Sequence, residues 1–306
     1  MSAPLIVALP RNEAMAGPLA QAVGAELAPI ELRNFPDGET YLRYQSSSLA
    51  GRSVVILCSL DRPDAKLLPL LFAAATARDL GASSVGLACP YLGYMRQDQR
   101  FKPGEAITSV HFARLLSSAF DWLVTVDPHL HRRKSLSEIY TTRAVALQAA
   151  PLIAAWIRER VERPLLIGPD AESEQWVAMV ARDAGAPHVI LNKVRHADRD
   201  VEVSVPEIER WRGHTPVLVD DIVSTARTMI ETLRHLAHAR TAQAICIAVH
   251  GVFAGRAYLE LLEAGAARVV TTNTVPHESN GIDVTNLLSE AIRDIAMAPA
   301  LPADSS

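Results

Sequence analysis

Short apolar segments alternate with longer amphipathic segments along the whole chain. The short segments are rich in Val, Ile and Leu and have the length of strands, whereas the longer ones have the apolar spacing of helices. Near-continuous apolar strands separated by helices indicate mainly parallel sheets that helices cover on both faces. We therefore predict an α/β fold with strands at residues 5–9, 53–60, 84–91, 122–129, 165–170, 188–194, 216–223, 244–252 and 268–274.

The strands fall into two series along the chain. Amphipathic segments such as 64–82 and 225–239 connect strands within a series, and we predict a further helix over 144–164, between the two series. A chain of 306 residues is long enough for two domains, at about 150 residues for each. We therefore expect one α/β domain over residues 1–145 and a second over residues 146–306.

Composition and charge narrow the class of protein. A net charge of -4 predicts no nucleic-acid partner. The first ten residues lack a basic segment, and no apolar run has the length of a membrane span, so we expect neither a signal peptide nor a membrane partner. Cys58, Cys89 and Cys246 each lie in an apolar strand-like run, which predicts buried free thiols in a reducing compartment. We expect a cytoplasmic protein.

Polar residues at the ends of the predicted strands are the first candidates for a site, because open α/β sheets bind ligands at the carboxyl ends of their strands. The two ends richest in charge are Asp127 with His129, and Asp220 with Asp221. The second pair lies within VLVDDIVSTARTM, residues 217–229, where hydroxyl and small residues follow the two acids before a predicted helix.

Residues 217–229 have the chemistry of a sugar-phosphate site. The free N–H groups and positive end of a helix N-terminus suit a phosphate, and the nearby hydroxyls add donors. Paired carboxylates repel each other in an apolar site, unless sugar hydroxyls or a cation satisfy them. The alternative is a helix N-cap that follows a surface turn, with both aspartates solvated.

The same stretch resembles the phosphoribosyl-diphosphate (PRPP) loop of type I phosphoribosyltransferases. Nearly the whole chain is similar to one branch of that fold, the ribose-phosphate diphosphokinase family. This resemblance implies two tandem type I phosphoribosyltransferase-like domains. The other segments that carry it are NFPDGETYLRY (34–44), CPYLGYMRQDQRFKPGEAIT (89–108), TVDPHLH (125–131), LNKVR (191–195), AVHGVF (248–253) and TTNTVP (271–276).

The resemblance also implies roles for individual residues. ATP would contact Phe35, Asp37, Glu39, Arg96, Gln97 and Asp98. Ribose 5-phosphate would contact Asp220, Asp221, Ser224, Thr225, Ala226, Arg227 and Thr228. Mg²⁺, the implied cofactor, would be held by His129 and Asp170. The catalytic residues would be Lys193 and Arg195, in a loop over the reaction centre.

The implied reaction transfers the diphosphoryl group of ATP to the C1 hydroxyl of ribose 5-phosphate, giving PRPP and AMP. Such a transfer needs alignment and charge stabilisation rather than a protein nucleophile. The resemblance further implies a homo-oligomer built from dimers, with a hexamer among the expected forms. In that family the segment around Phe35 reaches the ATP bound by a neighbouring subunit.

The chain departs from the family pattern at three places. Arg227 stands where the family has glycine, Glu172 to Glu174 replace a glycine pair, and Val194 interrupts a Lys-Arg-Arg run. Two alternative functions follow. A non-catalytic regulatory subunit would explain the missing glycines, whereas a phosphoribosyltransferase would explain residues 217–229 but not the ATP-like segments.

Overall fold

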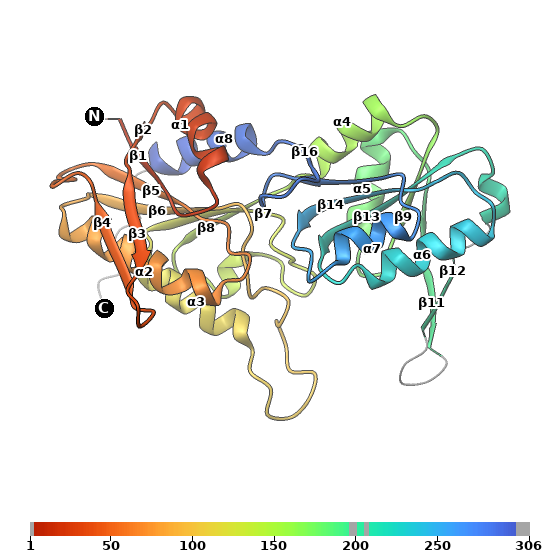
Figure 1. Ribbon diagram of the computed structural model, residues 1–306, viewed down its shortest axis with the longest axis horizontal. Helices are drawn as coiled ribbons and strands as arrows, with labels where there is room; N and C mark the ends of the chain where they lie inside the picture. Colours follow the sequence, from red (N-terminus) through yellow and green to blue (C-terminus); the bar gives the residue numbers. More distant parts are fainter. Residues whose placement is uncertain (1–2, 196–200, 205–207, 298–306) are drawn as a thin grey trace. The chain divides into compact units, whose positions relative to one another are not determined.

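The computed structural model describes residues 3–195, 201–204 and 208–297. The described chain forms two compact units (Figure 1): residues up to Leu147 together with helix α8 (Thr285–Met297), and Gln148–Val284. Helix α8 therefore joins the first unit, whereas we expected contiguous domains over 1–145 and 146–306. Its side chains Leu288 and Ile292 are fully buried, and Arg293 donates a hydrogen bond to the carbonyl of Ala22 at 2.9 Å.

Six of the described strands form a parallel sheet in the first unit, in the order β2-β1-β5-β6-β7-β8. Helices α1 (Glu13–Val23) and α8 lie on one face, and α2 (Asp64–Asp79) and α3 (Thr108–Ala119) lie on the other (Figure 1). The strand bounds are β1 Leu5–Ala8, β2 Glu26–Leu27, β5 Ser53–Leu57, β6 Ser84–Cys89, β7 Trp122–Val126 and β8 Arg143–Leu147.

An antiparallel hairpin of β3 (Ile30–Asn34) and β4 (Thr40–Tyr44) lies outside this sheet. The hydroxyl of Tyr44 donates a hydrogen bond to the carbonyl of Ala73 in α2, at 2.8 Å. The hairpin is therefore anchored on a helix of its own unit, while its turn is exposed.

The second unit repeats the same strand order. Six of its described strands form a parallel sheet, β10-β9-β13-β14-β15-β16. Helices α4 (Ala150–Arg160) and α5 (Glu174–Ala184) cover one face, and α6 (Arg227–His238) and α7 (Ala257–Glu263) cover the other (Figure 1). The strand bounds are β9 Pro164–Gly168, β10 His188–Ile190, β13 Thr215–Val223, β14 Ile245–Gly251, β15 Arg268–Thr272 and β16 Asn280–Ile282.

This repetition confirms the predicted fold class of two tandem α/β domains with mainly parallel sheets. In each unit the first strand connects to a neighbour on one side, and the chain then continues on the other side. The point at which the direction reverses, called the switch point below, is where open α/β sheets bind ligands. It lies between β1 and β5 in the first unit and between β9 and β13 in the second.

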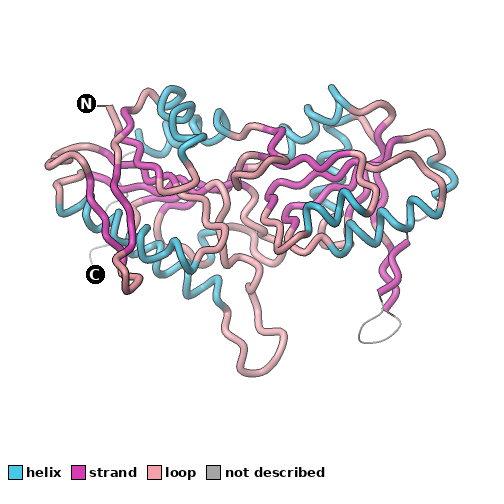
Figure 2. The backbone as a smooth tube through the Cα atoms, viewed as in Figure 1, coloured by secondary structure: helices cyan, strands magenta, loops and turns pink. Residues whose placement is uncertain are grey.

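Two predicted elements are wrong in detail. The start of the predicted helix 144–164 is strand β8, which pairs with β7, and α4 begins at Ala150 with a proline in its first turn. Pairing with β7 sets the strand conformation of β8. In this strand Val145 and Leu147 alternate with alanines, a pattern that fits a strand at the edge of a sheet. The predicted strand 188–194 divides into β10 and β11 (Asn192–Arg195), and β11 pairs with β12 (Val201–Ser204) as a hairpin (Figure 2).

Short 3-10 helices span Leu136–Glu138 and Ile208–Trp211. No helix in the described part of the chain combines the length and the apolar character that a membrane crossing needs.

Candidate active site

Strained backbone gathers at the carboxyl ends of the strands in both units. Nine described residues other than glycine have a positive φ. Strain of this kind collects at ligand sites, where the surrounding structure holds it in place. Seven of the nine follow a parallel strand, namely Arg11 (β1), Arg62 (β5), Tyr94 (β6), Asp127 and His129 (β7), Ala226 (β13) and Phe253 (β14).

Asp220 and Asp221 lie near the carboxyl end of β13, at the switch point of the second unit. Both residues are half-buried. The backbone N–H of Asp221 donates a hydrogen bond to Asp220 Oδ1 at 2.9 Å. Consecutive residues of a strand point to opposite faces, so the two carboxylates leave the same strand end in different directions.

Burial raises the pKa of Asp220 well above its ordinary value, and the negative charges of Asp221 and Asp170 raise it further. The residue keeps some exposed surface, but its carboxyl group is surrounded by protein atoms. Asp170 follows β9, the neighbour of β13 in the sheet. The structure therefore brings three predicted site carboxylates together at one switch point.

The turn that carries Asp170 is closed by Ser173. Ser173 Oγ donates to the carbonyl of Asp170 at 2.7 Å, and Asp170 Oδ1 accepts from the backbone N–H of Ser173 at 3.2 Å. Ser173 is buried and directly precedes α5. These hydrogen bonds order the turn although the glycine pair expected from the family is missing.

Residues 224–228 connect β13 to α6. Ser224 and Thr228 are half-buried, whereas Thr225 and Arg227 are exposed. Ala226 has a φ of 56° in the left-handed region, and Arg227 is the first residue of α6. The left-handed position therefore falls on Ala226, one residue before the arginine that replaces a family glycine.

Phe35, Asp37 and Glu39 form the exposed turn of the β3–β4 hairpin. The carboxylate of Asp37 accepts a hydrogen bond from the backbone N–H of Glu39 at 3.1 Å. Phe35 is 40% exposed, and its ring lies edge-on to Tyr41 with centroids 5.9 Å apart. Asp37 thus supports the turn, and the Arg33 guanidinium lies over the Phe35 ring, 5.0 Å from its centroid.

The segment from Arg96 to Asp98 follows β6 in the first unit. Arg96 is exposed, and the side chain of Gln97 accepts a hydrogen bond from Thr108 at 3.0 Å. The side chain of Asp98 is 3% exposed and pairs with Arg132 at 3.4 Å. Asp98 therefore connects its own loop to the segment that carries Arg132. This contact was not predicted from the sequence.

His129 follows β7 with a φ of 55°. Its ring centroid lies 4.0 Å from that of His131, and its backbone N–H donates to the carbonyl of Asp127 at 2.8 Å. Both imidazoles therefore lie at the carboxyl end of a strand of the first unit.

Lys193 and Arg195 lie on β11, where they pair with Val203 and Val201 of β12. The predicted loop over the reaction centre continues into residues 196–200, which lie outside the described residues. Lys193 and Arg195 therefore belong to the same strand of one hairpin.

A buried charge cluster at the switch point of the first unit was not predicted from the sequence. Asp61, whose side chain is 5% exposed, pairs with Arg11 at 3.3 Å and also with Lys66. Lys66 Nζ further donates to the carbonyl of Ser59 at 2.6 Å. The signal was an acidic residue shortly after an apolar run, the same pattern that identified Asp220.

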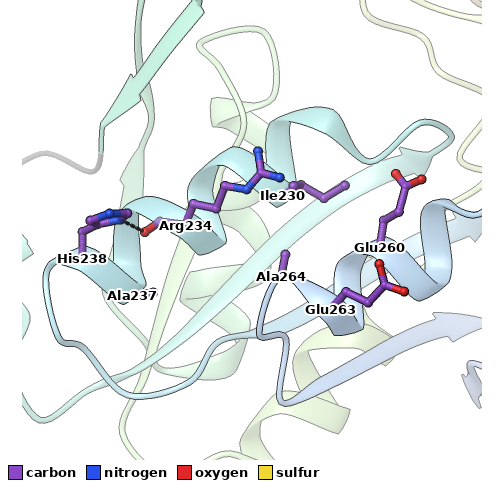
Figure 3. Close-up of a pocket in the computed structure, with 7 residues that line it drawn as sticks. All are labelled: Ile230, Arg234, Ala237, His238, Glu260, Glu263 and Ala264. Carbon is purple, nitrogen blue, oxygen red and sulfur yellow. Dashed lines mark hydrogen bonds between the residues drawn. The ribbon is translucent and has the colours of Figure 1, made fainter.

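A cavity of about 370 Å³ lies elsewhere in the second unit, between α6 and α7 (Figure 3). Two of its charged residues are paired, since Arg234 contacts Glu231 at 2.6 Å and Glu263 contacts Arg256 at 2.8 Å. It includes none of the predicted site residues. The strand ends, rather than this cavity, carry the candidate chemistry.

Comparisons with known proteins agree with this arrangement. A family sequence model described as the N-terminal domain of ribose phosphate pyrophosphokinase matches residues 5–119, and one described as a phosphoribosyl transferase domain matches residues 135–286. The fold of the phosphoribosylpyrophosphate synthetase from Mycobacterium smegmatis is similar, with a TM-score of 0.83, 24% identity, and coverage of 96% of this chain and 99% of that one. Fold and site together define a protein of two phosphoribosyltransferase-like domains.

Sequence relatives show to which family of phosphoribosyltransferase-like proteins the chain belongs. The ribose-phosphate pyrophosphokinase of Methanothermobacter thermautotrophicus is 33% identical over 291 residues, which span 95% of this chain and 100% of the relative. That of Methanopyrus kandleri is 33% identical over 281 residues, which span 91% and 94%. The chain belongs to the ribose-phosphate pyrophosphokinase family.

Proposed function

We propose that the chain is a catalytically active ribose-phosphate pyrophosphokinase. It transfers the diphosphoryl group of ATP to the C1 hydroxyl of ribose 5-phosphate and releases AMP and PRPP. The reaction forms a bond between the C1 oxygen and the β-phosphorus, breaks the bond from that phosphorus to the oxygen it shares with the α-phosphorus, and releases the hydroxyl proton.

The arrangement around Asp220 and Asp221 carries this proposal. Partly buried carboxylates accept hydrogen bonds from the hydroxyls of a sugar, and a charge-assisted bond of this kind is about twice as strong as a neutral one. Ser224, Thr225 and the start of α6 then offer hydroxyl and N–H donors to the 5-phosphate. We assign Ala226, Arg227 and Thr228 to the same phosphate.

The donor set of the second unit fits a magnesium ion. Asp220 and the two carboxylates that raise its pKa, Asp221 and Asp170, supply a negative field and the oxygen atoms that Mg²⁺ prefers. Asp170 and His129 are the residues we propose as Mg²⁺ ligands. When bound, the ion would neutralise charge on the triphosphate.

The first unit supplies the residues proposed for ATP. The exposed Phe35 ring suits stacking on adenine, with Asp37 and Glu39 beside it. Arg96 presents an exposed cation for the phosphates, and Gln97 and Asp98 order its loop. We propose that the hairpin turn serves the ATP of a neighbouring subunit, so that the active form is a homo-oligomer built from dimers.

Lys193 and Arg195 are the proposed catalytic residues. Their cations would meet the charge that spreads over the transferred group, and preorganised charges of this kind stabilise a transition state. One strand of the hairpin carries both residues, and we propose that they act together. The three free cysteines are buried, which is consistent with a reducing compartment such as the cytoplasm.

Formation of AMP from ATP and ribose 5-phosphate by the purified protein tests this function. A phosphoribosyltransferase would consume PRPP instead, and it would leave the match over residues 5–119 without an explanation. A non-catalytic subunit would form no AMP. Sugar-dependent AMP formation therefore separates the proposed function from both alternatives.

A further inference from the structure

The segment after β14 holds the candidate phosphate loop through its backbone. The N–H groups of Val252 and Phe253 both donate to the carbonyl of Val223, each at 3.0 Å. The N–H of Ala254 donates to the carbonyl of Ser224, also at 3.0 Å. Val223, two residues after Asp221, ends β13, and Ser224 begins the loop to α6. These three hydrogen bonds therefore set where that loop begins.

Phe253 makes this contact from a strained conformation. Its φ of 33° lies in the left-handed region, which bulky side chains rarely adopt. Such a conformation persists only when the surrounding structure holds it in place, and strain of this kind marks sites where a position matters. Contacts of the Phe253 ring with its neighbours hold this residue in place.

A cluster of three rings holds it. The Phe253 side chain is 8% exposed, and its ring centroid lies 4.6 Å from that of His277 and 5.5 Å from that of Tyr258. Tyr258 and His277 also pack on each other at 4.7 Å. His277 Nδ1 is hydrogen-bonded to Ser279 Oγ at 2.9 Å.

Gly251 leaves the space that the Phe253 ring occupies. A Cβ atom at position 251 would lie 2.6 Å from Phe253 Cε2 and 2.9 Å from Thr271 Cγ2. Both distances are too short for carbon atoms, so a side chain at this position would displace the ring. The absence of a side chain at residue 251 is thus required by the ring cluster.

We propose that Phe253 is a positioning residue for the sugar-phosphate site. The ring cluster fixes the backbone of residues 252–254, that backbone fixes Val223 and Ser224, and these in turn set the donors at residues 224–228. The inference rests on the proposed function, because it assigns ribose 5-phosphate to this loop. It goes further in naming residues that touch no substrate but determine the affinity for the sugar phosphate.

Steady-state kinetics of Phe253→Ala test the proposal. We expect the KM for ribose 5-phosphate to rise at least tenfold and the KM for ATP to change less than twofold. Phe253→Leu keeps an apolar side chain and should recover much of the affinity. Gly251→Ala removes no contact but should raise the same KM, and Gly251→Ala/Phe253→Leu should recover part of that loss because leucine lacks the Cε2 atom.

Ile247→Ala is the matched control, since Ile247 is a fully buried residue of the same strand that pairs with Val219 and makes none of the three loop hydrogen bonds. It should lower stability and leave the KM for ribose 5-phosphate unchanged. The proposal is overturned if Ile247→Ala raises that KM as much as Phe253→Ala does, or if Phe253→Ala and Gly251→Ala both leave it unchanged.

Asp220→Asn/Asp221→Asn in the same assay separates the positioning role of Phe253 from the assignment of the sugar phosphate to this loop. If this double variant raises the KM for the sugar while the Phe253 and Gly251 variants do not, the positioning role alone is wrong. If the double variant also leaves the KM unchanged, the sugar-phosphate assignment is wrong and the inference falls with it.

Discussion

The backbone N–H of Asp221 donates a hydrogen bond to the carboxylate of Asp220 at 2.9 Å, so one acid of the pair orients the other. The remaining acceptor positions of both side chains are the ones we assign to the hydroxyls of ribose 5-phosphate. In this proposal the sugar hydroxyls are the partners of the two like charges near the end of β13, which leads to the first prediction.

Asp220→Asn/Asp221→Asn should weaken binding of the sugar phosphate. A hydrogen bond to a charged group contributes about 1.5–3 kcal/mol, so the KM for ribose 5-phosphate should rise about 10- to 150-fold. The KM for ATP should change far less. Asp183→Asn, on helix α5 of the same unit, is the control and should alter neither value. A loss of ATP binding with an unchanged sugar KM would show that the acids serve the metal nucleotide.

Ala226→Gly should stabilise the protein. Ala226 occupies the left-handed region, where a side chain costs about 1–2 kcal/mol, and glycine removes that cost. After the greater chain entropy of glycine in the unfolded state is subtracted, we expect a net gain of about 0.5–1 kcal/mol in the free energy of unfolding. Urea unfolding of the whole protein, compared between Ala226→Gly and the unchanged chain, measures this gain.

Ala178→Gly is the control for this change, because Ala178 lies inside helix α5. There glycine should destabilise the protein by about 1 kcal/mol. If both substitutions lower stability equally, the backbone at residue 226 is not strained.

Asp98 and Arg96 should differ although they are neighbours. Asp98→Asn weakens the pairing with Arg132, so it should lower the thermal midpoint and raise the KM for ATP together. Arg96→Ala removes an exposed side chain and should raise only the KM for ATP. Calorimetry combined with kinetics checks both. A normal midpoint for Asp98→Asn with a raised KM would indicate that this carboxylate contacts the nucleotide directly.

Lys193→Ala should affect the chemical step. A charge that acts on the transition state lowers kcat when it is removed and leaves KM nearly unchanged. Losing one preorganised donor costs about 2.7–4 kcal/mol, or about 10²–10³ in kcat. Arg195→Ala should behave alike, and the double variant should lose less than the sum because both residues act in one element. Arg212→Ala is the control, because Arg212 is exposed and is not among the predicted site residues; it should leave kcat unchanged. A near-normal kcat for Lys193→Ala contradicts the catalytic role.

The proposal that subunits share the ATP site predicts complementation between them. A Phe35→Ala/Glu39→Ala protein mixed with a Lys193→Ala protein should regain activity, because hybrid assemblies contain some sites with neither defect. Mass spectrometry of the mixture establishes that subunits exchange. Exchange without any recovery of activity would place the whole site within one subunit.

Local pattern predicted the strands that lie in the middle of the sheets, because both faces of β5, β6, β7 and the first half of β13 are covered and their sequences are mostly apolar. Strand β8 escaped prediction because it lies at a sheet edge, is half-exposed and precedes a helix without a clear break. The place of α8 depends on contacts with the other end of the chain. No local pattern contains that information.

In the site, too, some features followed from local sequence pattern and others depend on contacts between distant residues. The aspartate pair was visible as charge at the end of an apolar run, and the resemblance supplied roles for the loop behind it. The pairing of Asp98 with Arg132 joins residues 34 positions apart. The choice of Ala226 rather than Arg227 for the left-handed position is set by where α6 begins. Both facts depend on the folded chain.

We claim that the protein transfers a diphosphoryl group, and ³¹P nuclear magnetic resonance of the reaction mixture follows each phosphorus atom of ATP into its product. With purified protein, Mg²⁺, ATP and ribose 5-phosphate, we predict that the α-phosphorus appears in AMP and that the β- and γ-phosphorus appear together as a diphosphate on the sugar, in equal amounts. Formation of ADP with a sugar bisphosphate, or no sugar-dependent loss of ATP by the folded protein, would contradict the claim.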